Sequence, residues 1–398
     1  MKQQNSQIWR EDIKKFKEKT AAFYAGEIDK ASYKGISGYY GSYAQKGGKR
    51  SMLRLRMPAG QVTAEKMAFV ARMLREHHIS LVHFTTCQTI QLHDLEEQAV
   101  CRIMEEALEN GIITMGGGGD YPRNVMCSPL SGTDPEEYFD VQPWAKAAGE
   151  YLLGFLKAEK LPRKLKVGFS GSPANVTHAT YRDLGFAARE DGTFDVYSAG
   201  GLGAMPKLGV KVAEGVKPEK ILYYVKAMWL TFRAYGNYEN RAKARTRFMQ
   251  DALGGPEQYR KAYLEKLEDV FASGENLDLS VKAEPVLKKG NGTRADGPRV
   301  RKQKQEGLYT VVWHPAADRT RTLSADSAMP SDRWKAPKSG SHRMRPHISS
   351  TSQERKPGKC WNLPPTVRNL FLKHRSAVSE AASVRWGPGI LRRCWLHV

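Results

Sequence analysis

Apolar and polar positions follow two different periods along the first part of the chain. Residues 8–30 have the period of about 3.6 residues of an amphipathic helix, whereas SMLRLRMP at residues 51–58 alternates as a half-buried strand does. A helical segment, two strand-like runs around TTCQ and a second helix that ends at Gly111 follow. This order predicts an N-terminal helix and arm over residues 1–45 and a compact α+β unit of ferredoxin-like type over residues 46–112.

The pattern changes after this unit. Four consecutive glycines in IITMGGGGDYPRNVMCSPLSG exclude a helix interior, and EEYFDVQPWAKAAGEYLLGFLKAEK then has a helical period. A basic strand (LPRKLKVGFSGSP), a strand that ends in GGLG and a long helical stretch interrupted near Gly236 follow. We predict an α/β domain over residues 113–273, a polar linker over 274–302 and the opening strand of a further half domain over 303–315.

Length and cysteine usage narrow the class of protein. The 398 residues suffice for two or three domains, and no run of about 18 apolar residues could span a bilayer. The N-terminal sequence has no apolar signal core, so we expect a cytoplasmic protein with no membrane partner. Its cysteines form no C-x-x-C set, which indicates reduced thiols and no metal site in the chain as written. They are Cys87, Cys101, Cys127, Cys360 and Cys394.

The net charge of +21 is distributed unevenly along the chain. Residues 316–398 contain 16 Lys and Arg against 5 Asp and Glu, a net charge of +11. A basic excess attracts polyanions, so a nucleic-acid-binding protein is an alternative function. We expect no nucleic-acid partner, because no binding module is recognisable in this tail and the basic residues of the body lie beside glycine loops.

Three segments of the body combine glycines with basic residues. In GGGGDYPRNV the loop amides and Arg123 could bind an anion, although a structural glycine turn explains them equally well. In LPRKLKV strand alternation places Lys164 and Lys166 on one face, where they could grip one small anion or protect a strand edge. GGLG alone is a weak indication of a binding site, since it lacks the spacing of a dinucleotide fingerprint.

The order of these segments is more specific than any one of them. MLRLRMP, TTCQTIQLH, GGGGDYPRNV, LPRKLKV, GGLG and NYENRAKARTRF follow one another in a way that resembles the siroheme-dependent nitrite and sulfite reductases, over residues 8–315. The resemblance implies paired ferredoxin-like and siroheme/4Fe–4S domains, with siroheme and a 4Fe–4S cluster that share a cysteine. It implies six-electron reduction of nitrite to ammonia or of sulfite to sulfide, with electrons from ferredoxin or a flavoprotein.

The resemblance also assigns roles to individual residues. Arg123, Lys164 and Lys166 would face the substrate, where cationic donors stabilise developing charge and supply protons. Siroheme is fringed with carboxylates, which need Arg, Lys and amide donors. The residues expected around it are Arg54, Arg56, Thr86, Gln88, Gln91, Asn124, Gly201, Gly203 and Arg241. Asn240, Arg241 and Arg245 either brace carboxylates or merely cap helices.

One position departs from the family pattern. Many relatives have arginine within TTRQ, where it contacts the anion, and this chain has Cys87 there. A thiol cannot make the bidentate bond of a guanidinium. The departure weakens any choice between nitrite and sulfite.

The C-terminal tail matches nothing in the family, whose cluster ligands lie on C-x5-C and C-x3-C segments. Residues 316–398 are rich in Ser, Arg, Pro and Trp without a sustained period. Intrinsic disorder is one explanation, but such tails rarely hold this many Trp, Leu and Cys. A shifted reading frame is another, since SAVSEAASVRW at residues 376–386 then permits SCIGGSVCQV, which contains C-x5-C. We predict a frameshift near Ala316 and a poorly ordered tail.

This interpretation has a consequence for activity. We expect an α+β protein whose second pseudo-repeat is missing or scrambled, with the cluster ligands absent from this chain. Without thiolates the cluster cannot bind, so we expect the chain as written to be an inactive, truncated version of the enzyme. A cofactor-free partner subunit is a further alternative.

Overall fold

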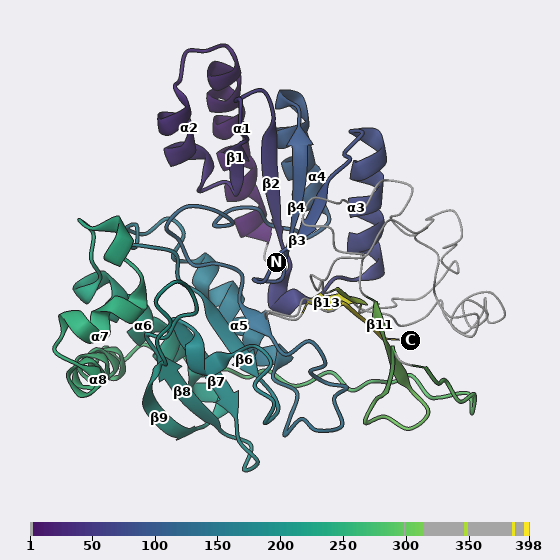
Figure 1. Ribbon diagram of the computed structural model, residues 1–398, viewed down its shortest axis with the longest axis vertical. Helices are drawn as coiled ribbons and strands as arrows, with labels where there is room; N and C mark the ends of the chain where they lie inside the picture. The colour runs from purple at the N-terminus through teal and green to yellow at the C-terminus, as the bar shows by residue number, and fades with distance from the viewer. Residues whose placement is uncertain (1–2, 298, 314–345, 349–383, 387–393, 398) are drawn as a thin grey trace. The chain divides into compact units, whose positions relative to one another are not determined.

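The computed structural model describes residues 3–297, 299–313, 346–348, 384–386 and 394–397 (Figure 1). The chain divides into two compact units, of which the first combines Met1–Gly117 with Leu287–Val398 and the second is Gly118–Val286. Most of the tail for which a frameshift and poor order are predicted therefore lies outside the described residues.

The first unit begins with helices that pack beside an antiparallel sheet. The sheet has the order β1-β2-β4-β3. Its strands are β1 (Ser42–Ala44), β2 (Ser51–Arg56), β3 (Val82–Phe84) and β4 (Thr89–Leu95). The helices are α1 (Gln3–Tyr24), α2 (Lys30–Ser37), α3 (Ala64–Glu76) and α4 (Glu97–Glu109). The helix predicted over residues 8–30 ends at Tyr24, because the chain turns at Gly26 with a φ of 84°, and α2 begins only at Lys30.

Alternation along β2 and β4 explains why this unit holds together. Leu53 and Leu55 of β2 and Ile90 and Leu92 of β4 are fully buried, so the apolar positions of both strands face one core. The register places Arg54 opposite Gln91, and both therefore point away from that core. Thr63 caps α3, since its side chain accepts a hydrogen bond from the Lys66 amide.

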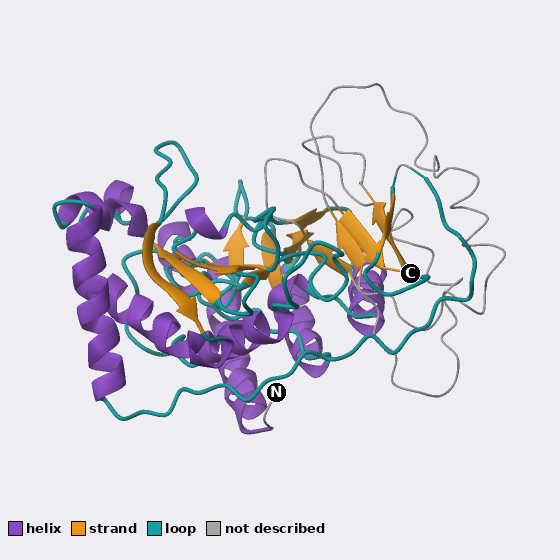
Figure 2. Ribbon diagram, turned by 90° about the horizontal axis from the view of Figure 1, so that it is seen from below, coloured by secondary structure: helices purple, strands orange, loops and turns teal. Residues whose placement is uncertain are grey.

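A second sheet of the first unit gathers strands from the later part of the chain. Its order is β10-β11-β12-β13-β14. The bounds are β10 (Val300–Lys302), β11 (Tyr309–Trp313), β12 (Pro346–Ile348), β13 (Val384–Trp386) and β14 (Cys394–His397). Residues 275–296 contain neither helix nor strand and form a long loop before β10 (Figure 2).

The second unit contains a mixed sheet in the order β5-β6-β7-β8-β9. The strands are β5 (Met126–Cys127), β6 (Val167–Ser170), β7 (Leu184–Ala188), β8 (Phe194–Ser198) and β9 (Val210–Val216). The first three are parallel, whereas β7, β8 and β9 are antiparallel. Phe169, Phe186 and Phe194 are fully buried, and the first two rings stack with centroids 4.5 Å apart, so the sheet has an aromatic core.

Helices complete the second unit. They are α5 (Gln142–Leu153), α6 (Ile221–Tyr235), α7 (Met249–Ala252) and α8 (Pro256–Ala272). The sequence pattern extends α5 to Lys160, but the helix is shorter because it begins beside Pro143 and ends before Gly154. At Gly236 α6 stops where a Cβ atom would lie 2.4 Å from the Phe232 carbonyl oxygen and from Pro162.

Candidate functional site

Two lysines precede β6 in an extended segment of the second unit. Leu165 between them is buried and bridges to Pro122, so Lys164 and Lys166 share the opposite side of the segment. In the part of the chain that the structure describes, neither ammonium group makes a hydrogen bond or an ion pair. Two half-buried cations without a counter-charge are costly, which suggests a site built for an anion.

Further cations surround these lysines. Burial first, and then neighbouring positive charges, lower the pKa of Lys164 to about 8. The positive neighbours that act on it are Lys166, Arg123, Arg245 and Arg163. We call these five residues the cationic cluster.

Arg123 joins the cluster through the backbone. Its N–H donates to the Leu165 carbonyl at 2.8 Å, which places the segments before β5 and β6 side by side. Its Nη2 donates to the Gly119 carbonyl at 2.7 Å, so the glycine-rich loop holds the guanidinium. Asn124, which follows, is 3 % exposed and donates to the Val125 carbonyl at 3.3 Å.

A carboxylate at the end of the glycine loop compensates two arginines. Asp120 accepts from Arg163 at 2.9 Å and from both terminal nitrogens of Arg241, at 2.8 and 3.2 Å. Burial acts to raise the pKa of Asp120, but the bonds from Arg241 and Arg163 outweigh it and lower the pKa. The guanidinium of Arg241, a residue predicted near the cofactor, thus binds Asp120 in this structure.

A second carboxylate, which is fully buried, was not predicted from the sequence. Asp183 is 1 % exposed and accepts from the Lys166 amide at 2.8 Å and from Arg245 Nη2 at 2.9 Å. The Thr246 hydroxyl donates to it as well. No spacing rule links Asp183 to residues about sixty positions later, so only the fold reveals this contact.

The GGLG loop lies against another arginine. A Cβ atom on Gly201 would lie 3.1 Å from Arg247 Cδ, and one on Gly203 would lie 3.6 Å from Arg247 Nη2. Gly201 thus leaves room for the guanidinium, whose pKa is lowered by burial and by Arg245. The loop is otherwise apolar and open, with Leu202 and Met205 exposed by 52 % and 61 %.

The first unit contributes its own donors from β2 and β4. Arg54 donates to the Gly117 carbonyl, and Gln91, with its amide oxygen turned to the guanidinium, accepts from Arg54 Nε at 3.2 Å. Burial lowers the pKa of Arg54, against the opposing charge of Cys87. No carboxylate pairs with Arg54 among the described residues. The charge of this half-buried arginine is therefore not offset by a carboxylate of the described residues.

The remaining predicted residues of this unit differ in exposure. Arg56 is 4 % exposed and donates to the Met115 carbonyl at 3.2 Å, which braces the segment before the glycines. Gln88 is fully buried with a φ of 58° and packs on Gly60, where a Cβ atom would lie 2.7 Å from its amide carbon. Thr86 is exposed at the turn, and Cys87 is half-buried.

Metal-binding groups are not found in the described part of the chain. No cluster of three or more His, Cys, Asp or Glu side chains there could hold a metal ion. Cys101 and Cys127 are buried apart from such groups, and Cys360 lies outside the described residues. In the same described part, no helix is long and apolar enough to cross a membrane.

Two family models match the chain, one in each of two successive segments. Residues 43–110 match the model described as "Nitrite/Sulfite reductase ferredoxin-like half domain", and residues 118–271 match "Nitrite and sulphite reductase 4Fe-4S domain". The chain belongs to the nitrite and sulfite reductase family. The predicted family and the predicted α+β fold with a ferredoxin-like half domain are therefore confirmed.

Individual relatives of this reductase-family chain are of two kinds. It is 30 % identical over 241 residues to "Sulfite reductase [NADPH] hemoprotein beta-component" of Geobacillus kaustophilus, covering 51 % of this chain and 42 % of the relative. It is 26 % identical over 284 residues to "Ferredoxin--nitrite reductase" of Synechococcus elongatus, covering 69 % and 53 %. The chain thus spans about half the length of these relatives.

A solved structure shares the fold. "Structure of Mycobacterium tuberculosis NirA protein" superposes with a TM-score of 0.64 and 21 % identity, covering 98 % of this chain and 66 % of that one. The predicted site residues fall on both units of this family fold. Within the second unit, Arg123, Lys164 and Lys166 lie near one another, whereas the roles assigned to all of these residues stay predictions.

Proposed function

We propose that this chain provides the substrate-anion and siroheme-binding part of a reductase that converts nitrite to ammonia or sulfite to sulfide. The observation that carries the proposal is the cationic cluster, in which Lys164 and Lys166 have no carboxylate partner among the described residues. Arg163 and Arg245 of the cluster are paired with Asp120 and Asp183, so the two lysines are the members whose charge is left for a ligand to offset.

The cluster is suited to a small oxyanion. Lys164 and Lys166 present two ammonium groups on one side of an extended segment, with Arg123 held beside them by the Gly119 carbonyl. Reduction of an oxyanion releases oxygen as water and consumes protons. A lysine with a pKa of about 8 is largely protonated at neutral pH and gives up its proton more readily than an ordinary lysine. We assign Lys164 the role of holding and delivering a proton at Nζ.

Donors in the first unit fit a tetrapyrrole carboxylate. Arg54 is half-buried and, among the described residues, is bonded only to the Gly117 carbonyl and the Gln91 amide. Siroheme, when bound, supplies the iron on which the oxyanion is reduced. Arg54 would bind one of its carboxylates, and the buried Gln88 and Arg56 would keep the adjoining backbone rigid.

For the iron–sulfur cluster, the described residues provide no comparable set of ligands. The described residues offer no thiolate set for it, so we assign no residue of this chain to that group. The proposed electron donor is ferredoxin or a flavoprotein, in line with relatives whose names specify ferredoxin or NADPH.

We also propose that the reading frame shifts near Ala316 and that the chain as written does not turn over. The support is the C-x5-C segment that the shifted frame permits at residues 376–386. Sequencing the DNA around codons 312–320 from independent isolates tests this directly. A continuous reading frame without a slip there would remove the proposal.

Anion binding by the chain as it stands tests the proposed function. Sodium sulfite and sodium nitrite are titrated into the protein at low ionic strength, and the dissociation constant is followed by calorimetry. Lys164→Met or Lys166→Met should weaken binding by about tenfold or more, since each removes a charge-assisted hydrogen bond.

The matched control is Lys211→Met, because Lys211 is an exposed lysine of the same unit that is paired with Asp195 and Glu214. Its affinity for either anion should equal that of the unmodified chain. Equal losses in all three variants would indicate a general effect of net charge and would contradict an oxyanion site at the cluster.

A further inference from the structure

One buried carboxylate connects two members of the cationic cluster. Asp183 lies immediately before β7, and Lys166 lies immediately before β6, which is parallel to it. The Lys166 amide donates to Asp183 Oδ2 at 2.8 Å, and the Lys166 carbonyl accepts from the Leu184 amide at 3.3 Å. Both polar groups of the Lys166 backbone are therefore fixed by the start of β7, which sets where its side chain begins.

The same carboxylate holds an arginine that other charges repel. Arg245 Nη2 donates to both oxygens of Asp183 at 2.9 Å, while Arg245 is one of the positive neighbours that lower the pKa of Lys164. The Thr246 hydroxyl, fully buried, donates to Asp183 Oδ1 and keeps the carboxylate in place. Without this anchor, like-charge repulsion would favour a larger separation between Arg245 and the lysines.

We infer that Asp183 is a positioning residue: it holds Lys166 and Arg245 at the spacing that lets the cationic cluster bind one small oxyanion. The inference rests on the proposed function, because it gives the cluster a ligand. The inference predicts an effect on anion affinity opposite to that expected from the charge of Asp183 alone. A carboxylate so near an anion site weakens binding through its charge alone, so its removal would tighten binding unless its positioning effect is larger.

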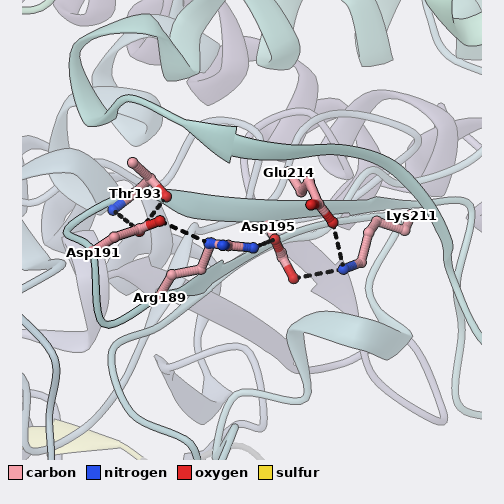
Figure 3. Close-up of polar contacts among 6 residues, drawn as sticks. All are labelled: Arg189, Asp191, Thr193, Asp195, Lys211 and Glu214. Atoms are coloured by element: carbon pink, nitrogen blue, oxygen red, sulfur yellow. Dashed lines mark hydrogen bonds and ion pairs between the residues drawn. The ribbon is translucent and has the colours of Figure 1, made fainter.

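The second unit offers a matched carboxylate elsewhere on its sheet. Asp195 of β8 accepts from Arg189 at 3.1 Å and from Lys211 at 2.8 Å (Figure 3). Its side chain is 16 % exposed, and it too joins two cations, Arg189 just after β7 and Lys211 of β9. Asp195→Asn therefore adds the same charge to the unit as Asp183→Asn, without touching Lys166 or Arg245.

The test measures sulfite affinity by calorimetry at a temperature where circular dichroism shows each variant to be folded. Asp183→Asn should weaken sulfite binding by about tenfold, the effect of losing one well-placed charge-assisted bond. Asp195→Asn should leave the affinity unchanged or raise it slightly. Thr246→Val, which removes one bond to Asp183 without changing any charge, should produce a smaller loss in the same direction.

The outcomes separate this inference from the proposed function. Sulfite binding by Asp183→Asn that is as tight as, or tighter than, that of the unmodified chain overturns the positioning role and leaves the oxyanion site intact. If Asp183→Asn does not fold, unchanged affinity in Thr246→Val overturns the role instead. An unmodified chain that binds no sulfite contradicts the proposed function, and the inference fails with it.

Discussion

Two charged groups of the second unit, the cationic cluster and the network around β8 and β9, differ in how their positive charges are compensated. In the network, Arg189 pairs with Asp191 at 3.2 Å and with Asp195 at 3.1 Å, and Lys211 pairs with Asp195 and Glu214 (Figure 3). Each cation there has a carboxylate. In the cluster, two lysines have none among the described residues.

The pKa values show the physical result of this difference. The hydrogen bond to Asp195 raises the pKa of Lys211, whereas burial and like charges lower the pKa of Lys164 to about 8. The network therefore stabilises its own charges, and the cluster leaves a positive potential that a ligand can satisfy. A high count of basic residues predicts neither arrangement, because the positions of the acidic partners decide between them.

Removing Asp183, the fully buried carboxylate that holds Lys166 and Arg245, should have the largest effect on stability. Asp183→Ala leaves Arg245 and the Lys166 amide without a buried acceptor. We expect the free energy of unfolding to fall by about 3–5 kcal/mol, the cost of breaking a buried pair from one side. Urea denaturation followed by circular dichroism measures it, and a loss below about 1 kcal/mol would show that the pair is not effectively buried.

The next largest effect should be on the pH dependence of anion binding at the cationic cluster. Lys164 loses its positive charge as the pH rises through about 8, so the affinity for nitrite should be highest below this value and decline above it. The expected loss is about tenfold between pH 7 and pH 9.5, from one charge-assisted bond. Nitrite is the ligand of choice because its own charge does not change in this range.

Lys164→Arg provides the control for that titration. A guanidinium stays protonated across the whole range. The nitrite affinity of the Lys164→Arg variant should therefore be nearly independent of pH. A decline of the same size in Lys164→Arg would assign the pH dependence to another group.

Stability should respond to pH with the opposite sign. The pKa of Lys164 is lowered from 10.5 in an ordinary lysine to about 8 in the fold. Between these values the unfolded chain binds more protons, so this residue's contribution to stability rises from pH 8 to pH 10.5. Lys164→Met should abolish that rise in urea titrations at several pH values, and an identical rise in the variant would contradict it.

Breaking the surface network should have the smallest effect. Lys211→Ala removes exposed ion pairs to Asp195 and Glu214, with the lysine side chain 41 % exposed. Such pairs contribute about 0–1 kcal/mol, so the free energy of unfolding should change by no more than that. A fall of several kcal/mol in the free energy of unfolding would mean that these surface ion pairs stabilise the fold as strongly as the buried pair of Asp183 and Arg245.

Sequence reasoning succeeded where a short segment contains the whole signal. The spacing of Lys164 and Lys166 in LPRKLKV is enough to place them on one side, because an extended backbone alternates its side chains. The order of glycine and basic segments was enough for the family, which the matches over residues 43–110 and 118–271 confirm. Helix ends were less accurate, as at α5, since the apolar period continues past Gly154 where the helix does not.

Contacts between distant segments could not be read in this way. Arg241 is 121 residues from Asp120, and Arg245 is 62 residues from Asp183. The sequence offered helix capping and carboxylate binding as alternatives for these arginines. The fold pairs each of them with a buried or half-buried aspartate, whereas Lys164 and Lys166 have no carboxylate partner among the described residues.

The sequence by itself determined the family, the α+β class and the local placement of the two lysines, because these depend on the period and order of neighbouring residues. The tertiary structure alone decided which cations are neutralised within the protein. Charge compensation depends on distances of a few ångströms between side chains far apart in sequence, and parallel β6 and β7 bring Asp183 to Lys166 only when the sheet has formed.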